Sequence, residues 1–426
     1  MKNRFHTVLG AAALAVATLA TAGCDDFLSV ENPGVIEAST VDPVADAETF
    51  SRSAESDFFT AFDDVVAYGA WFSGEAWLDD TFPTRNDISK RVTDNRNGTL
   101  NTELYAPLSQ SIASNSRVLQ LLAGTPRESS VSAARAAMNL GFSLVLMAET
   151  FCQGVISSGP EALGSPLTPA QTLDSAVVRF QQAITLGTGL NTAEGTSIAN
   201  AARVGLARAY LQKGEYQNAI NAGTPVPAAF VYNALRVDDP SNRGRLGNTV
   251  YSFTVTRPNL VVPPYYRALN DTRVPSTRTG QPGTGQGGQL VFHAQAKYPA
   301  WNTPVRVASG LEARYLVAEA QLKLGNTAPA VALAAERRTA GGSTVEGDDF
   351  ATGNRALIEL LDQKSRDLYL EGHHLGDWRR NPAETPYTPR AGTTYYIPAV
   401  GGNFGALTCL PISASETDNN PNFPRA

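Results

Sequence analysis

Two groups of aromatic residues lie outside the strong helical stripes of this 426-residue sequence, and polar side chains follow the first group. Flat rings beside carboxylates and amides suit a ligand with apolar C–H faces and hydroxyl edges, as sugars have. The alternative is that each ring packs in the core and that the polar residues form a solvated loop. The first group is Tyr68, Trp71 and Trp77, followed by Asp79, Asp80, Arg85 and Asn86, and the second is Tyr265, Tyr266, Tyr298 and Trp301.

The sequence carries no strong catalytic motif. It has no nucleophile elbow, no zincin helix and no Cys/His pair with a supporting motif. A glycoside hydrolase needs only two carboxylates at a set separation, and Glu75 with Asp79 or Asp80 is the pair that would serve. We therefore predict no catalytic residue and keep a secreted glycoside hydrolase as a minor alternative.

Three patterns resemble cofactor or metal sites but lack the required context. Residues 283–288 match G-x-G-x-x-G, yet no predicted strand precedes them within a βαβ unit and no predicted helix follows. His373 and His374 are adjacent, so their side chains diverge, and no third ligand is suggested by spacing. We expect no cofactor and no resident metal. The acidic pairs Asp63-Asp64, Asp79-Asp80 and Asp348-Asp349 lack the ligand spacing of an EF-hand. Whether a calcium ion binds incidentally is left open.

Apolar residues recur at helical spacing along most of the chain, which predicts a mainly α fold. A capping box with proline at the first helical position is predicted at Thr168. Residues 206–220 and 312–326 resemble the helix junctions of tetratricopeptide (TPR) repeats, where small alanines let paired helices approach. Two copies so far apart form no tandem array, so an insertion must split the helical pairs. The predicted helices cover about 50–65, 104–122, 130–151, 168–187, 197–213 and 354–372.

The insertion spans about 225–307 and holds many prolines, glycines and short β-like runs such as 250–255. We expect it to be irregular and partly β. A segment of this length without helices usually carries a functional surface. We predict one domain over 44–426 that contains this insertion. Helical pairs are expected on either side of it, at about 44–224 and 308–380, followed by a loop-rich tail over 381–426.

The N-terminal segment predicts export and lipidation. A basic start precedes an uncharged run over 8–22, which is too short and too rich in small residues to span a bilayer. We predict a signal peptide over 1–23, and the residues ending at Cys24 resemble the lipobox of bacterial lipoproteins. Acyl chains on Cys24 would anchor the protein to a membrane, with 24–43 as a tether. The alternative is a soluble secreted protein with an incidental cysteine.

The two other cysteines are Cys152 and Cys409. An exported chain meets oxidising conditions, in which a disulfide between them can form. Two separate buried thiols are the alternative, because spacing along the chain does not fix the distance in space.

Composition excludes two classes of protein. With 42% hydrophobic and 17% charged residues the chain has ample apolar material for a core, so it is not disordered. Its formal charge is −6 at pH 7, and it has no basic stripe of the kind that a phosphate backbone requires. Nucleic acid is therefore not an expected partner.

Taken in order, these features resemble the SusD/RagB family of outer-membrane nutrient-binding lipoproteins over nearly the whole chain. The proline that often follows Gly154 is absent, and Ser413 stands where a second proline is common. The stretches that carry the resemblance are the lipobox at Cys24, residues 105–115, 151–155, 304–306, 312–313, 318–320, 371–380 and 410–412, and then Glu416 and Asn420-Pro421.

The resemblance implies four TPR-like helical pairs as a scaffold and an irregular insertion that shapes a binding face. It also implies a role: the protein would capture oligosaccharides or similar nutrients at the cell surface and close as a lid over a SusC-like TonB-dependent outer-membrane channel. The two aromatic regions would meet at the ligand face. Trp378, within 371–380, is expected to anchor the last helix.

A scaffold of the TPR type that assembles envelope proteins is the second hypothesis. In such a protein a concave helical groove would bind the partner and the insertion would be featureless. The ligand itself stays open among starch, other plant polysaccharides, host glycans and peptides.

Overall fold

Helices dominate the structure, a computed structural model that describes residues 42–159, 162–282, 290–342 and 353–424. Residues 43–426 form one unit. Several predicted features lie outside the described residues: the signal peptide, Cys24, nearly all of the tether, the glycine-rich stretch 283–288 and Asp348-Asp349.

The N-terminal helices form as their apolar spacing predicts. Thr168 starts α6 with the predicted capping box, in which its hydroxyl accepts from the Gln171 backbone N–H and the Gln171 side chain accepts from that of Thr168. The helices are α2 (Ala47–Ser73), α3 (Pro83–Ser89), the π-helix η2 (Leu100–Tyr105), α4 (Ala106–Leu122), α5 (Val131–Thr150), α6 (Pro169–Gly189), α7 (Ala193–Gln212) and α8 (Tyr216–Gly223).

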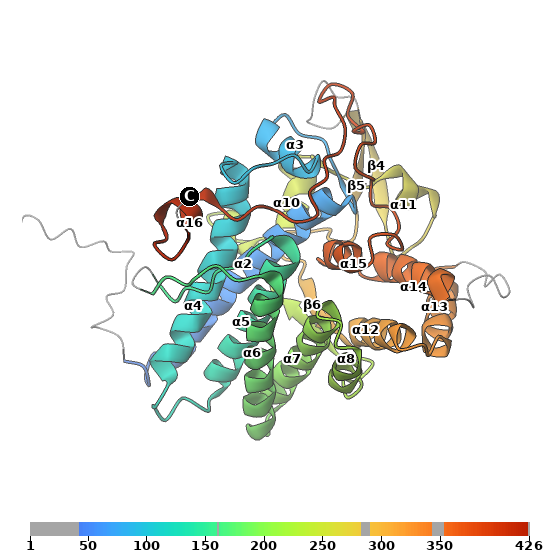
Figure 1. The fold of residues 1–426 in the computed structure, drawn as a ribbon. Coiled ribbons are helices and arrows are strands. Elements are labelled where there is room, and N and C mark those ends of the chain that lie inside the picture. Colours follow the sequence, from blue (N-terminus) through green and yellow to red (C-terminus); the bar gives the residue numbers. More distant parts are fainter. Residues whose placement is uncertain (1–41, 160–161, 283–289, 343–352, 425–426) are drawn as a thin grey trace, which may run out of the picture. The chain divides into compact units, whose positions relative to one another are not determined.

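Each long helix packs against the next along the chain. Helix α5 contacts α4 and α6, and α7 contacts α6 and α8, so the colours of Figure 1 run in order through the stack. Close approach depends on glycine. A Cβ on Gly141 of α5 or on Gly205 of α7 would come within 2.7 Å of the Phe180 ring of α6. This ring therefore fills the space between three helices.

A long insertion separates α8 from its partner, helix α12 (Gly310–Lys323). The two helices nevertheless pack together, and a Cβ on Gly223 would lie 2.7 Å from Val317. The helices α13 (Ala328–Ala340) and α14 (Gly353–Asp367) continue the stack. The helices on the two sides of the insertion therefore pack together, and the fold is mainly α.

The insertion holds short strands and short helices. Strand β2 (Val231–Ala234) pairs antiparallel with β6 (Val305–Ser309), which closes the insertion at its base. Strand β1 (Trp77–Leu78), from the loop after α2, pairs antiparallel with β3 (Leu260–Val261) of the insertion, and β4 (Ser276–Pro282) pairs antiparallel with β5 (Val291–Gln295). The insertion also holds the short helices α9 (Arg243–Leu246), α10 (Thr249–Val255) and α11 (Pro264–Ala268).

The β-like interpretation of 250–255 was wrong, because these residues form helix α10. Asn248 caps the helix: its side-chain oxygen accepts from the Tyr251 N–H at 2.8 Å, while its amide donates to the Thr303 carbonyl at 2.9 Å. This cap outweighs the weak strand preference of a short run of Val, Tyr, Phe and Thr.

The C-terminal tail returns to the end of α5 after helix α15 (His374–Arg380) and ends with α16 (Ala414–Asn419). Cys152 donates its backbone N–H to the Leu410 carbonyl at 2.9 Å, and the Leu410 N–H donates to Thr150 at 2.8 Å. The side chains of Cys152 and Cys409 form a disulfide with a Cα–Cα distance of 5.2 Å. Two separate thiols, the other alternative, are not what the structure has.

Helix α5 is the one described helix that is long and apolar enough to cross a membrane, and 94% of its most apolar window is buried inside the protein. Core helices pass the same test, so its composition reflects its place in the core.

A buried ionic network surrounds residues 371–380. Glu371 accepts from Arg306 of β6 at 2.7 and 2.8 Å and from Lys297 at 2.5 Å. Arg380 donates two hydrogen bonds to Glu319 of α12, both at 2.8 Å, and a third to Asp377 at 2.7 Å. The segment after α14 is thereby tied to the insertion and to the scaffold, in agreement with the anchoring role expected for it.

The same segment is also hydrogen-bonded to the end of α5. Arg379 donates to the carbonyls of Ala148 and Glu149, both at 2.7 Å. The Glu149 carboxylate in turn accepts from Arg208 of α7 at 2.9 Å. Three helices of the scaffold therefore meet this one segment.

Glu75 is a buried carboxyl beside this network. It accepts from the Leu370 N–H at 2.9 Å, and burial raises its pKa to about 8. The folded protein therefore holds a proton on Glu75 at neutral pH, whereas the unfolded chain releases it above about pH 4.5.

We expect loss of the disulfide to lower the free energy of unfolding by about 2–5 kcal/mol, because the unfolded chain regains the freedom of a long loop. The ring spans 257 residues of sequence. Cys152→Ala, Cys409→Ala and the double variant should cost the same in urea unfolding, because each removes the same bond. Additive costs, or two free thiols in the unfolded unreduced protein, would contradict the bridge.

Glu371→Ala should cost about 3–5 kcal/mol in urea unfolding, because it leaves Arg306 and Lys297 without their shared carboxylate. Glu336→Ala is the matched control. Its ion pair with Arg314 is exposed on both sides, so its loss should cost less than about 1 kcal/mol. Similar costs for the two variants would show that the network does not stabilise the fold.

Glu75→Gln should flatten the pH dependence of stability between about pH 4.5 and 8. In the wild type, unfolding in this window releases the Glu75 proton, so the free energy of unfolding falls as pH rises, by at most about 1.4 kcal/mol per pH unit. Glutamine keeps the acceptor for Leu370 and cannot ionise. Urea unfolding of both proteins at several pH values measures the difference, and parallel curves would refute the raised pKa.

Candidate functional site

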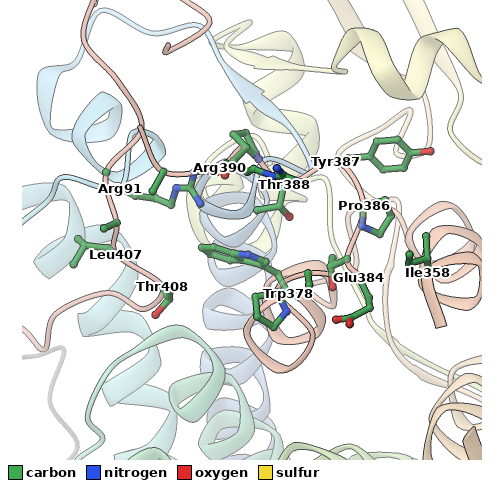
Figure 2. A pocket seen from close by; sticks show the side chains of 17 residues that line it. Arg91, Ile358, Trp378, Glu384, Pro386, Tyr387, Thr388, Arg390, Leu407 and Thr408 are labelled. Carbon is green, nitrogen blue, oxygen red and sulfur yellow. Dashed lines mark hydrogen bonds between the residues drawn. The ribbon is translucent and has the colours of Figure 1, made fainter. Parts of the chain in front are cut away.

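A cavity of about 670 Å³ lies between the C-terminal tail, the turn after α3, α14 and α15. The tail provides most of its wall, through residues 382–391 and 405–408. Arg91, Ile358 and Trp378 complete the lining, and Figure 2 shows Arg91 and Thr388 above the Trp378 indole. The cavity therefore combines a cation, an aromatic ring and short polar side chains.

Arg91 is buried with 2% exposure and has an unusual backbone conformation for its type, with φ at 61°. Its guanidinium carbon lies 5.0 Å from the centre of the Trp378 ring and 4.9 Å from that of Phe404. Nη2 donates to the Pro389 carbonyl at 2.5 Å, while Nε is buried without an acceptor. Burial lowers the pKa of Arg91 to about 10, so the cation remains charged at neutral pH but is poorly compensated.

The tail closes tightly over this arginine. A Cβ on Gly405 would lie 2.2 Å from the Arg91 carbonyl oxygen, and the Gly405 N–H donates to the Lys90 carbonyl at 2.7 Å. Glycine is therefore required where the tail passes the turn after α3.

Two threonine hydroxyls of the cavity wall also lack partners within the described part of the chain. The Oγ1 atoms of Thr385 and Thr388 are buried and have no hydrogen bond. Buried polar groups are usually paired, so two unpaired hydroxyls beside one cavity are unusual. Glu384 and Arg390 line the same cavity.

A row of rings leads to the cavity. Trp77 stacks on Tyr396 with ring centres 4.3 Å apart, and its edge meets Tyr265 at 6.2 Å. Tyr265 stacks on Tyr387 at 5.1 Å, and Tyr387 lines the cavity. We call these four half-buried residues, Tyr396, Trp77, Tyr265 and Tyr387, the aromatic row. It joins one predicted residue from each aromatic region to two from the tail.

Four of the predicted rings are core residues instead. Helix α2 extends to Ser73, so Tyr68 and Trp71 lie within it rather than in a loop, and both are 1% exposed. Tyr266 and Tyr298 are 1% and 3% exposed, and the Tyr298 hydroxyl donates to Leu370 at 2.8 Å. For these four ligand candidates the alternative, packing in the core, is what the structure has, because their rings fill the space beneath the insertion.

Trp301 is half-buried at a separate place. Its ring meets the edge of Tyr251 at 5.4 Å, and the Arg243 guanidinium carbon lies 5.2 Å from its centre. No ring contact joins Trp301 to the aromatic row within the described residues.

The polar residues after Trp77 are buried as well. Arg85 donates to Asp80 at 2.9 Å and to Glu103 at 2.7 Å, and the Asn86 amide donates to the Asp80 carbonyl at 2.9 Å. Burial and the neighbouring Asp80 raise the pKa of Asp79 to about 6. These side chains fix the loop after α2, and they form neither the solvated loop nor an exposed set of ligand contacts.

The carboxylates considered for hydrolysis are also enclosed. Glu75 and Asp79 are 1% and 0% exposed, and Glu75 borders a cavity of about 10 Å³, which no sugar can enter. This pair is therefore not presented to a substrate in the structure. Among the described residues, no three His, Cys, Asp or Glu side chains gather as a metal-ligand set.

Sequence reasoning missed Arg91, Thr385, Thr388 and the tail rings, and it assigned Trp378 to structure alone. The tail was predicted as loop-rich, and its Pro- and Thr-rich composition between 382 and 398 gives no local signal for a cavity wall. Arg91 had no such signal, because only the folded tail shows that it lacks a carboxylate partner.

No family model matches the sequence, and neither does any curated protein. Solved structures do match. A SusD superfamily protein from Bacteroides thetaiotaomicron has a TM-score of 0.68 at 18% identity, covering 90% of this chain and 100% of that one. A SusD-like carbohydrate binding protein from Bacteroides vulgatus has a TM-score of 0.64 at 14% identity, covering 90% and 98%.

A third structure, surface glycan-binding protein A from Bacteroides uniformis, has a TM-score of 0.64 at 11% identity and covers 88% of this chain and 98% of its own. Each likeness covers 88–90% of this chain. The resemblance drawn from the sequence is therefore confirmed for the architecture, and the chain has the fold of the SusD superfamily.

Proposed function

We propose that the protein binds a carbohydrate at the cavity and the adjoining aromatic row, without catalysing a reaction. The observation that carries this proposal is the meeting of stacked rings with unpaired polar groups at one place. Sugars need both, since their C–H faces stack on rings and their hydroxyls exchange hydrogen bonds. The printed names of two structural neighbours, a carbohydrate binding protein and a surface glycan-binding protein, support the same class of ligand.

The threonines suit hydroxyl-rich ligands in particular. A threonine hydroxyl both donates and accepts, so it can pair with any sugar hydroxyl that turns toward it. The tail prolines provide apolar wall between them, at Pro382, Pro386 and Pro389.

We also propose the cellular role that the sequence resemblance implies. The protein would be held on the outer membrane by acyl chains on Cys24, exposed at the cell surface, and would pass its ligand to a SusC-like TonB-dependent channel. The predicted signal peptide and lipobox support the anchor, and the fold supports the role through its likeness to a surface glycan-binding protein. Co-purification of the channel with the lipidated protein from native membranes tests this partnership.

Thr385→Val and Thr388→Val should each weaken carbohydrate binding about 3–10-fold, because each removes one hydrogen bond and hardly changes the shape of the wall. A glycan array probed with the purified full chain identifies the ligand, and isothermal titration with that glycan measures the change. Thr256→Val, on the exposed end of the insertion helix α10, is the matched control and should leave affinity unchanged.

Full binding by both cavity variants would place the glycan elsewhere. A protein that binds no glycan, yet retains a partner protein through its helical groove, would instead be the envelope scaffold.

A further inference from the structure

Arg91 differs from the other buried arginines of the described chain. Five of them pair with a carboxylate: Arg85 with Asp80, Arg135 with Glu194, Arg208 with Glu149, Arg236 with Asp63 and Arg366 with Asp362. Arg91 pairs with none among the described residues. A buried guanidinium without a counter-ion is costly, so its persistence at a cavity wall calls for a reason beyond packing.

The fold holds this cation in one orientation. Trp378 and Phe404 each lie about 5 Å from its guanidinium carbon, and the Pro389 carbonyl accepts from Nη2. Nε is buried and makes no hydrogen bond to described residues. A planar guanidinium that is fixed in this way can receive an anion without losing further side-chain freedom.

Backbone strain is concentrated at the same wall. The described residues other than glycine with φ in the left-handed region are Arg91, Asn191, Asn270, Leu370 and Tyr387, and two of these line the cavity. The left-handed conformation is uncommon for arginine and tyrosine, and such strain tends to occur at binding sites.

We propose that the cavity binds a sugar that carries a carboxylate, such as a uronic or sialic acid residue, with Arg91 as the partner of that carboxylate. This inference rests on the proposed carbohydrate-binding function and names the class of its ligand. Carboxylates match the planar donors of a guanidinium, and the Thr385 and Thr388 hydroxyls are placed on the same wall for the sugar hydroxyls.

The surrounding charge favours a single acidic group over a densely charged chain. The protein carries a net charge of −6, and Glu384 lines the same cavity as Arg91 and Arg390. A polyanion would meet repulsion beyond the cavity, whereas one carboxylate would meet two cations within it.

The test compares matched acidic and neutral probes on the full chain. The pairs are an aldobiouronic acid, which carries one uronate, with its methyl ester, and sialyllactose with lactose; a singly sulfated galactan oligosaccharide is included. We expect at least one acidic probe to bind about tenfold tighter than its neutral counterpart, or more, in isothermal titration. Equal binding within both pairs, or tighter binding of the sulfated probe, would overturn the carboxylate assignment.

Two substitutions then test the arginine. Arg91→Gln should reduce the affinity for the acidic probe to that of its neutral counterpart, and Arg91→Lys should retain part of the preference because it keeps the charge but loses the planar fork. Arg257→Gln is the matched control, because Arg257 also lies over an aromatic ring, 4.6 Å from the centre of Phe82, but outside the cavity. Full preference in a folded Arg91→Gln protein would refute the role of Arg91.

The outcomes separate this inference from the proposed function. Binding of neutral glycans without any preference for acidic ones leaves the function standing and removes the inference. Absence of binding to every glycan removes both. If Arg91→Gln does not fold, the preference of the wild type within each pair and the Arg91→Lys variant decide the result.

Discussion

The buried polar contacts of residues 371–380 join elements from distant parts of the sequence to one short segment. In a stack of helical pairs most contacts lie between neighbouring helices. Glu371 connects this segment to strand β6 of the insertion, Arg380 connects it to α12, and Arg379 connects it to the end of α5. Because charges at these places are buried, each must keep its partner, and the geometry of all these elements is fixed together.

The same segment also positions part of the cavity and of the proposed binding region around it. Trp378 belongs to the same segment, and its ring supports the Arg91 guanidinium from one side. The insertion brings Tyr265 to the tail residue Tyr387, while the loop after α2 brings Trp77 to Tyr396. The cavity and the aromatic row therefore combine four distant parts of the sequence, none of which forms the site alone.

The sequence was sufficient for the scaffold because helical spacing, capping residues and small-residue junctions are local signals. The capping box at Thr168 and the pairing of α8 with α12 are examples. The binding region was predicted less well, for a physical reason. Tyr68 and Trp71 continue the apolar face of α2 beyond the point where the spacing of Phe58 and Phe62 was followed, so they were placed in a loop. A tryptophan has the same side chain whether it is exposed or buried. Only contacts between distant parts of the chain make Trp71 a core residue and leave Trp77 half-buried.

The disulfide has a consequence for when the cavity is complete. Cys409 directly follows Thr408, which lines the cavity, and Cys152 belongs to the rigid end of α5. The far wall of the cavity is thus fastened to the scaffold by a bond that a reducing cytoplasm does not permit. Loss of this bond would free the tail next to Thr408, so the position of this wall depends on the redox state of the two cysteines.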